Sequence, residues 1–167
     1  MEEKAILYCS NAGHAERYAT LLSKEVGLPA YRLGTEKLEK GTPVVFVGWI
    51  MAGTVKGLVK ATKKYDVRSV AAVGMSRDSS KQENDIRMRH HMSSSMKLFY
   101  LQGGMDLSLL KGVYHFMIKM MADSFSKKLE SKKDRSEEED EILQMAHDGK
   151  DCVSAEHLSA MVAYLKG

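Results

Sequence analysis

The stretch LYCSNAGHAERYATLL, residues 7–22, runs from an apolar segment through a turn of small and polar residues into a helical pattern. Residues 5–9 form an apolar run of strand length, and apolar side chains recur at helical spacing after the turn. The first N–H groups of a helix suit an anion, because these unpaired donors and the helix dipole both favour negative charge. Residues 10–15 are therefore a candidate anion site, although a turn capped by Ser10 or by water would need no ligand.

Strand and helix patterns alternate along the rest of the chain. Residues 43–49, PVVFVGW, form a continuous apolar run typical of a strand buried on both faces of a sheet. This alternation predicts parallel βαβ units with right-handed crossovers, and therefore an α/β three-layer sandwich around a five-stranded parallel sheet. The other strands are expected at residues 5–9, 31–33, 69–74 and 96–101, with helical patterns at residues 15–26, 55–62 and 81–91.

The C-terminal part of the chain is expected to be helical. An apolar helix is predicted from Asp106, as its N-cap, to residue 122, and Ser136 and Ser154 are predicted to precede two further helices. We expect residues 1–167 to form a single domain, in which residues 123–167 are an acidic helical extension.

The composition is that of an ordinary soluble globular protein, with 44% hydrophobic and 28% charged residues. Cys9 and Cys152 form no CxxC pair, which favours a reducing, cytoplasmic setting, and the first residues lack the pattern of a signal peptide. Charged residues interrupt the apolar stretch at residues 107–122, so it is not expected to span a bilayer, while a peripheral membrane contact remains open. The basic balance of residues 1–122 suits an anionic ligand, a membrane surface or an acidic partner.

Ligands of an open parallel sheet bind beyond the carboxyl ends of its strands. The loops that matter are therefore residues 10–15, 49–54, 75–80 and 102–106. The second of these loops begins with Trp49, the only tryptophan, whose flat face suits a planar ring. A tryptophan at such a position is also common as a core or rim aromatic.

The sequence resembles the flavodoxin superfamily over about residues 4–122. The resemblance to this superfamily rests on five alternating strand and helix units with a candidate anion loop at residues 10–15, an aromatic residue that can cover a ring at Trp49, and a polar loop at residues 75–80. The stretch GGMDLSLL at residues 103–110, followed by YHFMIKMM at residues 114–121, is similar to its small branch that includes quinone-dependent protoporphyrinogen oxidases. The resemblance implies a flavodoxin-like sandwich with strand order 2-1-3-4-5 and FMN as the cofactor. By position, the resemblance implies that the FMN phosphate contacts Ser10, Asn11, Ala12, Gly13, His14 and Ala15. One side of the flavin ring would contact Trp49, Ile50, Met51, Ala52 and Gly53. The other side of the ring or its pyrimidine edge would contact Met75, Ser76, Arg77 and Asp78.

The resemblance implies an FMN-binding redox protein that carries electrons or a hydride through the flavin, with a redox protein or a quinone as its partner. No catalytic acid or base is required, and Arg77 would stabilise the reduced anionic flavin if it points inward. One alternative is a protoporphyrinogen-oxidase-like enzyme with a quinone acceptor. Another is a flavodoxin-fold binding or regulatory module with weak or lost FMN binding, because Ala12 and Ala15 stand where hydroxyls are common in the family.

Other chemistries lack the residues that they need. The chain has no GxGxxG, no GxxxxGKS/T and no GxSxG motif, which argues against dinucleotide, nucleoside triphosphate and serine hydrolase sites. Gly48 and Trp49 stand where a phospho-receiver protein needs a carboxylate. Aromatic residues, at 7%, are too few for a nucleic-acid-binding stripe.

No metal site is expected. The adjacent His90 and His91 point about 100° apart on a helix and suit a helix end, and His147, Cys152 and His157 have no fourth partner at a recognised spacing. The methionines of residues 107–122 suit either a core or an oily platform for a quinone, a porphyrin or a membrane surface.

Overall fold

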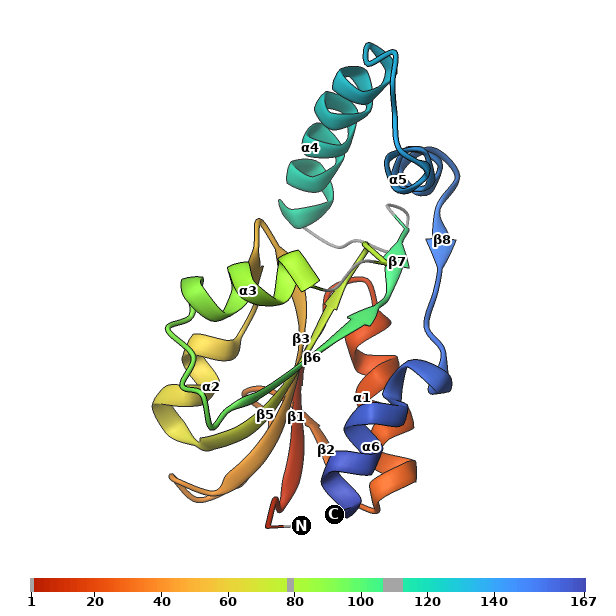
Figure 1. Cartoon of the computed structure of the whole chain (residues 1–167). Helices are drawn as coiled ribbons and strands as arrows, with labels where there is room; N and C mark the ends of the chain where they lie inside the picture. Colours follow the sequence, from red (N-terminus) through yellow and green to blue (C-terminus); the bar gives the residue numbers. More distant parts are fainter. Residues whose placement is uncertain (1, 78–79, 107–112) are drawn as a thin grey trace.

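A mostly parallel sheet forms the centre of the protein, which the computed structural model describes at residues 2–77, 80–106 and 113–167. Helices cover both faces of this sheet (Figure 1), so the fold is an α/β fold with three layers. The parallel strands lie in the order β2-β1-β3-β5-β6, and the short β4 pairs antiparallel with β3. Their bounds are β1 Ala5–Cys9, β2 Ala30–Arg32, β3 Pro43–Met51, β4 Thr54–Val55, β5 Asp66–Gly74 and β6 Lys97–Gln102.

The central strands β3 and β5 carry the longest apolar runs. Alternate side chains of a strand point to opposite faces, so Val45 and Val47 join one core cluster while Val44 and Phe46 join the other. All four side chains are fully buried, because helices cover both clusters. The prediction of a strand buried on both faces at residues 43–49 is thereby confirmed.

Each core cluster has its own helices. On one face, α1, the 3-10 helix η2 and α6 pack on the sheet, and on the other face α2 and α3 do so (Figure 1). The apolar spacing after residue 14 explains α1, which ends where Gly27 takes a left-handed φ of 72°. The bounds are α1 His14–Val26, α2 Leu58–Lys64, α3 Ser80–Arg89, η2 Ala155–Leu158 and α6 Ser159–Lys166.

One predicted helix begins later than its apolar pattern indicates. The pattern at residues 55–62 includes Val55, but Val55 lies in β4, and α2 begins only at Leu58. Gly57 separates the two elements with a left-handed φ of 87°, and a Cβ on it would lie 2.9 Å from Cβ of Cys9. Gly57 is thus the N-cap of α2, and its close approach to β1 is a tertiary contact that periodicity does not report.

Two helices extend beyond the carboxyl edge of the sheet (Figure 1). They are α4 (Val113–Glu130) and α5 (Glu137–Asp148), and the short strands β7 (Gly104–Met105) and β8 (Lys150–Asp151) pair where the chain leaves the sheet and returns to it. The helix predicted for residues 106–122 is confirmed from Val113 onward and continues to Glu130, while residues 107–112 lie outside the described residues. In the described parts of the chain, no helix is long and apolar enough to cross a membrane.

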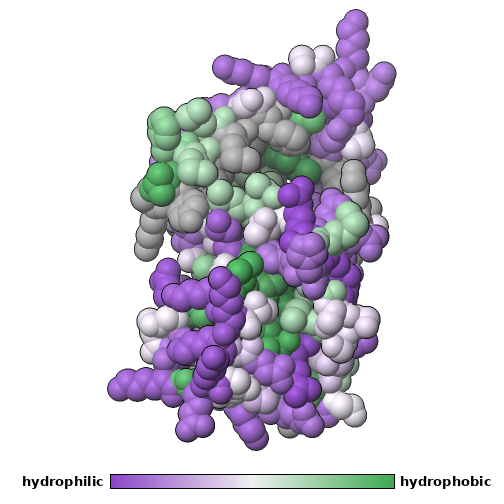
Figure 2. Space-filling model, turned by 90° about the vertical axis from the view of Figure 1, so that its left-hand side faces the viewer, coloured by the Kyte–Doolittle hydropathy of each residue, from purple (hydrophilic) through white to green (hydrophobic). Residues whose placement is uncertain are grey.

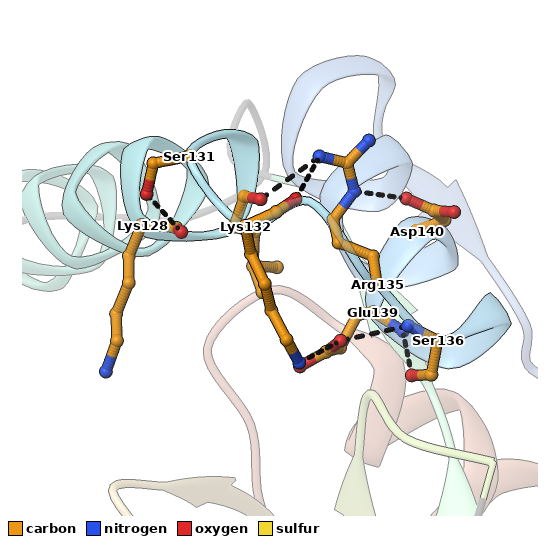
Figure 3. Close-up of polar contacts among 8 residues, drawn as sticks. Lys128, Ser131, Lys132, Arg135, Ser136, Glu139 and Asp140 are labelled. Atoms are coloured by element: carbon orange, nitrogen blue, oxygen red, sulfur yellow. Dashed lines mark hydrogen bonds and ion pairs between the residues drawn. The ribbon is translucent and has the colours of Figure 1, made fainter.

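Polar contacts hold the turn between α4 and α5 (Figure 3). Arg135 donates to the carbonyl oxygen of Leu129 at 3.1 Å and pairs with Asp140 at 2.6 Å. Ser136 and Glu139 form a capping box at the start of α5, as the sequence predicts. These contacts make α4 and α5 one helical hairpin.

The last helix belongs to the central core. Met161 and Leu165 of α6, like Leu158 of the preceding η2, are buried against α1, in the same cluster as side chains of β1 and β3. The acidic segment at residues 123–167 therefore contains both the outlying α5 and the core helix α6. Packing distinguishes them, whereas their net charge does not.

Candidate functional site

A cavity of about 380 Å³ lies between the carboxyl edge of the sheet and the α4–α5 hairpin. This volume is in the range of pockets that bind small molecules. Most of its wall is apolar, and it is built from the loops that follow β1, β3, β5 and β6. The described lining is Ser10, Ala12, His14, Ala15, Trp49, Ile50, Met51, Ala52, Gly53, Val73, Gly74, Met75, Ser76, Gln82, Gly104, Met105, Asp106, Ala122 and Ile142.

The first wall is the tight loop between β1 and α1. Gly13 adopts a left-handed φ of 98°, and its N–H donates to Oγ of Ser10 at 3.1 Å. The carbonyl oxygen of Ser10 accepts from Arg32 at 3.2 Å, which holds the loop from the side of β2. The N-cap residue of α1 is Gly13 itself, which has no side chain to cap the first turn. The first N–H groups of α1 therefore stand at this wall without an intrahelical acceptor, which suits an anion.

The second wall is the hairpin of β3 and β4. Ala52 and Gly53 form its two-residue turn with φ values of 50° and 72°, the left-handed conformations that match the twist of a tight hairpin. Gly48 permits the close return of the chain, because a Cβ on it would lie 2.6 Å from Cγ1 of Val55. Every residue from Trp49 to Gly53 lines the cavity, so the hairpin contributes a continuous run of lining residues that begins with Trp49.

The third wall joins the ends of β5 and β6. The side chain of Gln102 donates to the carbonyl oxygen of Met75 at 3.1 Å, and the N–H of Gly103 donates to that of Gly74 at 2.7 Å. Ser76 is buried in this wall, with 6% of its surface exposed. The loop after β5 is thus fixed to β6 before the chain continues into β7.

The α4–α5 hairpin closes the outer side. Ala122 of α4 and Ile142 of α5 reach the cavity. The neighbouring Glu141 pairs with Lys150 at 2.6 Å and with Arg77 at 2.9 Å, and the hydrogen bond from Lys150 lowers the pKa of Glu141. Arg77 is consequently bonded to α5 and is not part of the cavity lining, so the condition for stabilising a reduced flavin is not met in this conformation.

The cavity carries little charge of its own. Its described lining contains no lysine or arginine, and its titratable side chains are His14 and Asp106. Burial lowers the pKa of His14, although Asp151 opposes this effect with its Oδ1 at 3.9 Å from Nε2. An ion pair with Arg17 in turn holds Asp151. A neutral His14 leaves the backbone N–H groups of α1 as the principal attraction for an anion.

Most of the predicted site residues line this one cavity, including Trp49 and the residues from Ile50 to Gly53. Asn11 and Gly13 belong to the predicted anion loop but do not line the cavity, and Asp78 lies outside the described residues. Gly104, Met105 and Asp106 belong to the predicted loop of residues 102–106, and the lining residues outside all four predicted loops are Val73, Gly74, Gln82, Ala122 and Ile142. The strand-end rule indicates the loop of residues 102–106, whereas no pattern in the sequence indicates the contributions of α4 and α5.

His90 and His157 each contact a group of the protein through one ring nitrogen. Nε2 of His90 accepts from the N–H of Val55 at 2.9 Å, and Nδ1 of His157 lies 2.7 Å from the hydroxyl of Tyr18. Burial raises the pKa of the Cys152 thiol. In the described parts of the chain, no group of three or more His, Cys, Asp or Glu side chains could hold a metal ion.

The fold and the site together define an α/β protein with a largely apolar cavity at the carboxyl edge of a mostly parallel sheet. No family model, curated protein or solved structure matches this chain.

Proposed function

We propose that the protein binds FMN in this cavity and passes electrons or a hydride through the flavin. The observation that carries the proposal is the placement of a helix start with a glycine N-cap and of a tryptophan-bearing hairpin on two walls of one cavity. An FMN molecule needs both, because its phosphate is an anion and its ring is flat and largely apolar. When the parallel strands are numbered along the chain without the short β4, their order across the sheet is 2-1-3-4-5, which supports the flavodoxin-like resemblance.

The residues present fit the chemistry of this cofactor. The N–H groups at the start of α1, with Ser10 beside them, would hold the phosphate, and Trp49 would cover the ring. Met75 and Ser76 offer backbone groups to the opposite side of the ring, from a loop that Gln102 holds in place. When bound, the flavin supplies the redox chemistry, and the protein supplies orientation and excludes water.

Titration with FMN tests this proposal directly. Trp49 is the only tryptophan, so FMN binding is expected to quench the intrinsic fluorescence and the fluorescence of the flavin together. Trp49→Phe keeps an aromatic ring, and we expect it to retain binding, measured by flavin fluorescence alone. Tyr31→Phe, a change at an exposed residue outside the cavity lining, serves as the control variant. The absence of binding at micromolar FMN would contradict the proposal.

A second candidate function is oxidation of a porphyrinogen-like substrate with a quinone acceptor. An exposed apolar surface on α4 favours it: Val113, Phe116, Met117 and Met120 recur at helical spacing and are 68%, 66%, 38% and 58% exposed. Ala122 lies on the opposite side of α4 and lines the cavity. Figure 2 shows apolar side chains gathered at the level of α4, in the upper part of the face in view. Such a surface next to a cofactor cavity suits an apolar acceptor, a redox protein or a membrane surface.

Turnover assays separate this enzyme from an electron carrier. We expect the FMN-loaded protein to oxidise a porphyrinogen with a soluble quinone, and Phe116→Ser to slow that reaction while FMN binding stays unchanged. Val59→Ser, which changes an exposed apolar residue of α2, is the matched control. Bound FMN that is reduced and reoxidised by a redox protein, without porphyrinogen turnover, would favour the carrier. Addition of anionic vesicles tests the membrane contact through co-sedimentation.

A binding or regulatory module is the alternative if FMN binds weakly. Ala12 and Ala15 line the cavity where hydroxyls would strengthen a phosphate site, and Oγ of Ser10 already accepts from Gly13. We expect Ala12→Ser to tighten FMN binding if the phosphate lies on this loop. An unchanged affinity would place the phosphate elsewhere.

A further inference from the structure

A histidine outside the cavity holds the hairpin that forms its second wall. β4 is a two-residue strand, and within the antiparallel pair Val55 stands opposite Ile50. The N–H of Val55 points away from β3, and Nε2 of His90, just after α3, accepts its hydrogen at 2.9 Å. Val55 is 1% exposed, so water does not replace this acceptor readily.

This hydrogen bond defines the protonation state of the imidazole. A backbone N–H can only donate, so Nε2 must carry a lone pair, and the ring proton of a neutral His90 must be on Nδ1. An imidazolium has a donor at both nitrogens and would face the Val55 N–H with a hydrogen of its own. Protonation of His90 therefore removes the acceptor and leaves two donors opposed at the hairpin.

No neighbouring group on the described elements compensates for that charge. Burial lowers the pKa of His90, and it is the sole cause of the shift. No charged side chain, acidic or basic, contributes to this shift: the acidic residues of α3 are Glu83 and Asp85, and the last turn of α3 and its neighbouring elements also carry cations. These cations are Lys56 after β4, Arg87 and Arg89 on α3, and Lys97 on β6.

α3 contacts the same hairpin at a second point. A Cβ on Gly53 would lie 2.8 Å from Nε of Arg89, so the Arg89 side chain rests against the turn of the hairpin. The turn and the base of β4 thus both contact the C-terminal end of α3. Trp49 is hydrogen-bonded to the segment that His90 holds, because its carbonyl oxygen accepts from the N–H of Lys56, next to Val55, at 2.9 Å.

We infer that His90 is a positioning residue whose neutral form fastens the β3–β4 hairpin against α3, and that its protonation releases this hairpin and weakens ligand binding in the cavity. The inference holds for any ligand that contacts the segment from Trp49 to Gly53. Only its consequence for FMN rests on the proposed function.

The fluorescence of Trp49 tests the inference without a ligand. On acidification from about pH 7.5 to 5, we expect the emission of the wild-type protein to change with a midpoint below the usual histidine value of about 6.5, while far-ultraviolet circular dichroism stays constant. His90→Gln offers an amide oxygen as a non-titrating acceptor and is expected to abolish the change. His91→Gln, the matched control on the next residue, is expected to retain it. A wild-type titration that survives in His90→Gln, or that disappears in His91→Gln, would overturn the inference.

Nuclear magnetic resonance keeps the inference testable if His90→Gln does not fold. In the wild-type protein at neutral pH, the nitrogen shift of Nε2 of His90 is expected to be that of an unprotonated ring nitrogen. The Val55 amide signal is expected to move with the protonation of His90. An Nε2–H tautomer at neutral pH would contradict the inference.

The effect on FMN binding is measured by comparing variants at each pH, because the FMN phosphate titrates in the same range. We expect the ratio of wild-type to His90→Gln dissociation constants to rise about threefold or more from pH 7.5 to 5.5. If FMN does not bind at all, the proposed function fails, while the Trp49 titration still decides the role of His90. If FMN binds and this ratio stays constant, the hairpin release has no effect on binding, and the inference fails instead.

Discussion

The hydroxyl of Tyr18 on α1 lies 2.7 Å from Nδ1 of His157 in η2. The same hydroxyl donates to the carbonyl oxygen of Gln102 at 2.6 Å, so its single hydrogen is used and His157 must donate from Nδ1. One buried oxygen thereby joins α1, the end of β6 and the C-terminal segment. Burial raises the pKa of Tyr18 to about 12, so the hydroxyl stays protonated at neutral pH.

Removal of that hydroxyl should weaken the attachment of the C-terminal segment. We expect Tyr18→Phe to lower the free energy of unfolding by about 1–3 kcal/mol, because it leaves the Gln102 carbonyl and the His157 ring without a partner at this point. Urea unfolding measures the change. Tyr31→Phe, at a partly exposed residue of β2, is expected to stay within about 0.5 kcal/mol of wild type. Equal effects of the two changes would contradict this account.

Glu36 is expected to contribute acid-sensitive stability. Its side chain is 2% exposed and accepts from the hydroxyl of Tyr65 at 2.6 Å. Although burial opposes ionisation, the hydrogen bonds from Tyr65 and from backbone N–H groups lower the pKa of Glu36 to about 2. A carboxyl with a lowered folded pKa stabilises the protein above its unfolded pKa, and this contribution disappears as the pH falls through the folded pKa.

The test is the pH dependence of unfolding in Glu36→Gln. After allowance for solvent screening, we expect a loss of about 1–2 kcal/mol at pH 7 that shrinks as the pH falls from about 4.5 towards 2. Urea unfolding at successive pH values measures this difference. Glu39→Gln, at an exposed position, is expected to show no such trend. A loss that is constant with pH would assign the effect of Glu36→Gln to packing.

The turn of the cavity hairpin stores backbone strain at Ala52. Its φ of 50° is left-handed, and this conformation costs a residue with a Cβ about 1 kcal/mol or more. Asparagine tolerates this conformation, so we expect Ala52→Asn to raise the free energy of unfolding by about 0.5–1 kcal/mol. Ala52→Val, with a β-branched side chain, should lower it. Thermal unfolding checks both signs, and a destabilised Ala52→Asn protein would show that the strain is compensated elsewhere.

Gly104 lies in β7, whose pairing with β8 joins the two chain segments on either side of the α4–α5 hairpin. Its φ is 94°, and a Cβ on it would lie 2.0 Å from the carbonyl oxygen of Lys150, so alanine cannot keep the β7–β8 pair. We expect Gly104→Ala to cost about 2 kcal/mol or more and to expose the hairpin to limited proteolysis. Gly41→Ala has a similar left-handed φ of 85° but meets no atom within 4 Å, so it isolates the cost of the backbone conformation. Similar losses in both variants would show that the β7–β8 contact contributes little.

The sequence was sufficient for the alternation of strands and helices and for the main cavity loops. Apolar runs such as residues 43–49 and the helical spacing after residue 14 are local, so they identify β3 and α1 without knowledge of their partners. The strand-end rule then indicated the loops that carry Ser10, Trp49 and Met75, which line one cavity.

Tertiary structure alone decided which segments complete the cavity and the core. Periodicity assigned Val55 to a helix, but α2 begins only after Gly57, which packs closely against Cys9, and Val55 lies in the hairpin that His90 contacts. Charge placed α5 and α6 in one acidic extension, yet α6 packs on α1 while Ile142 of α5 reaches the cavity. Hydrophobic patterns record which side of an element is buried, and they do not record against which distant element it is buried. That choice depends on contacts such as Tyr18 with His157, which join residues far apart in the chain.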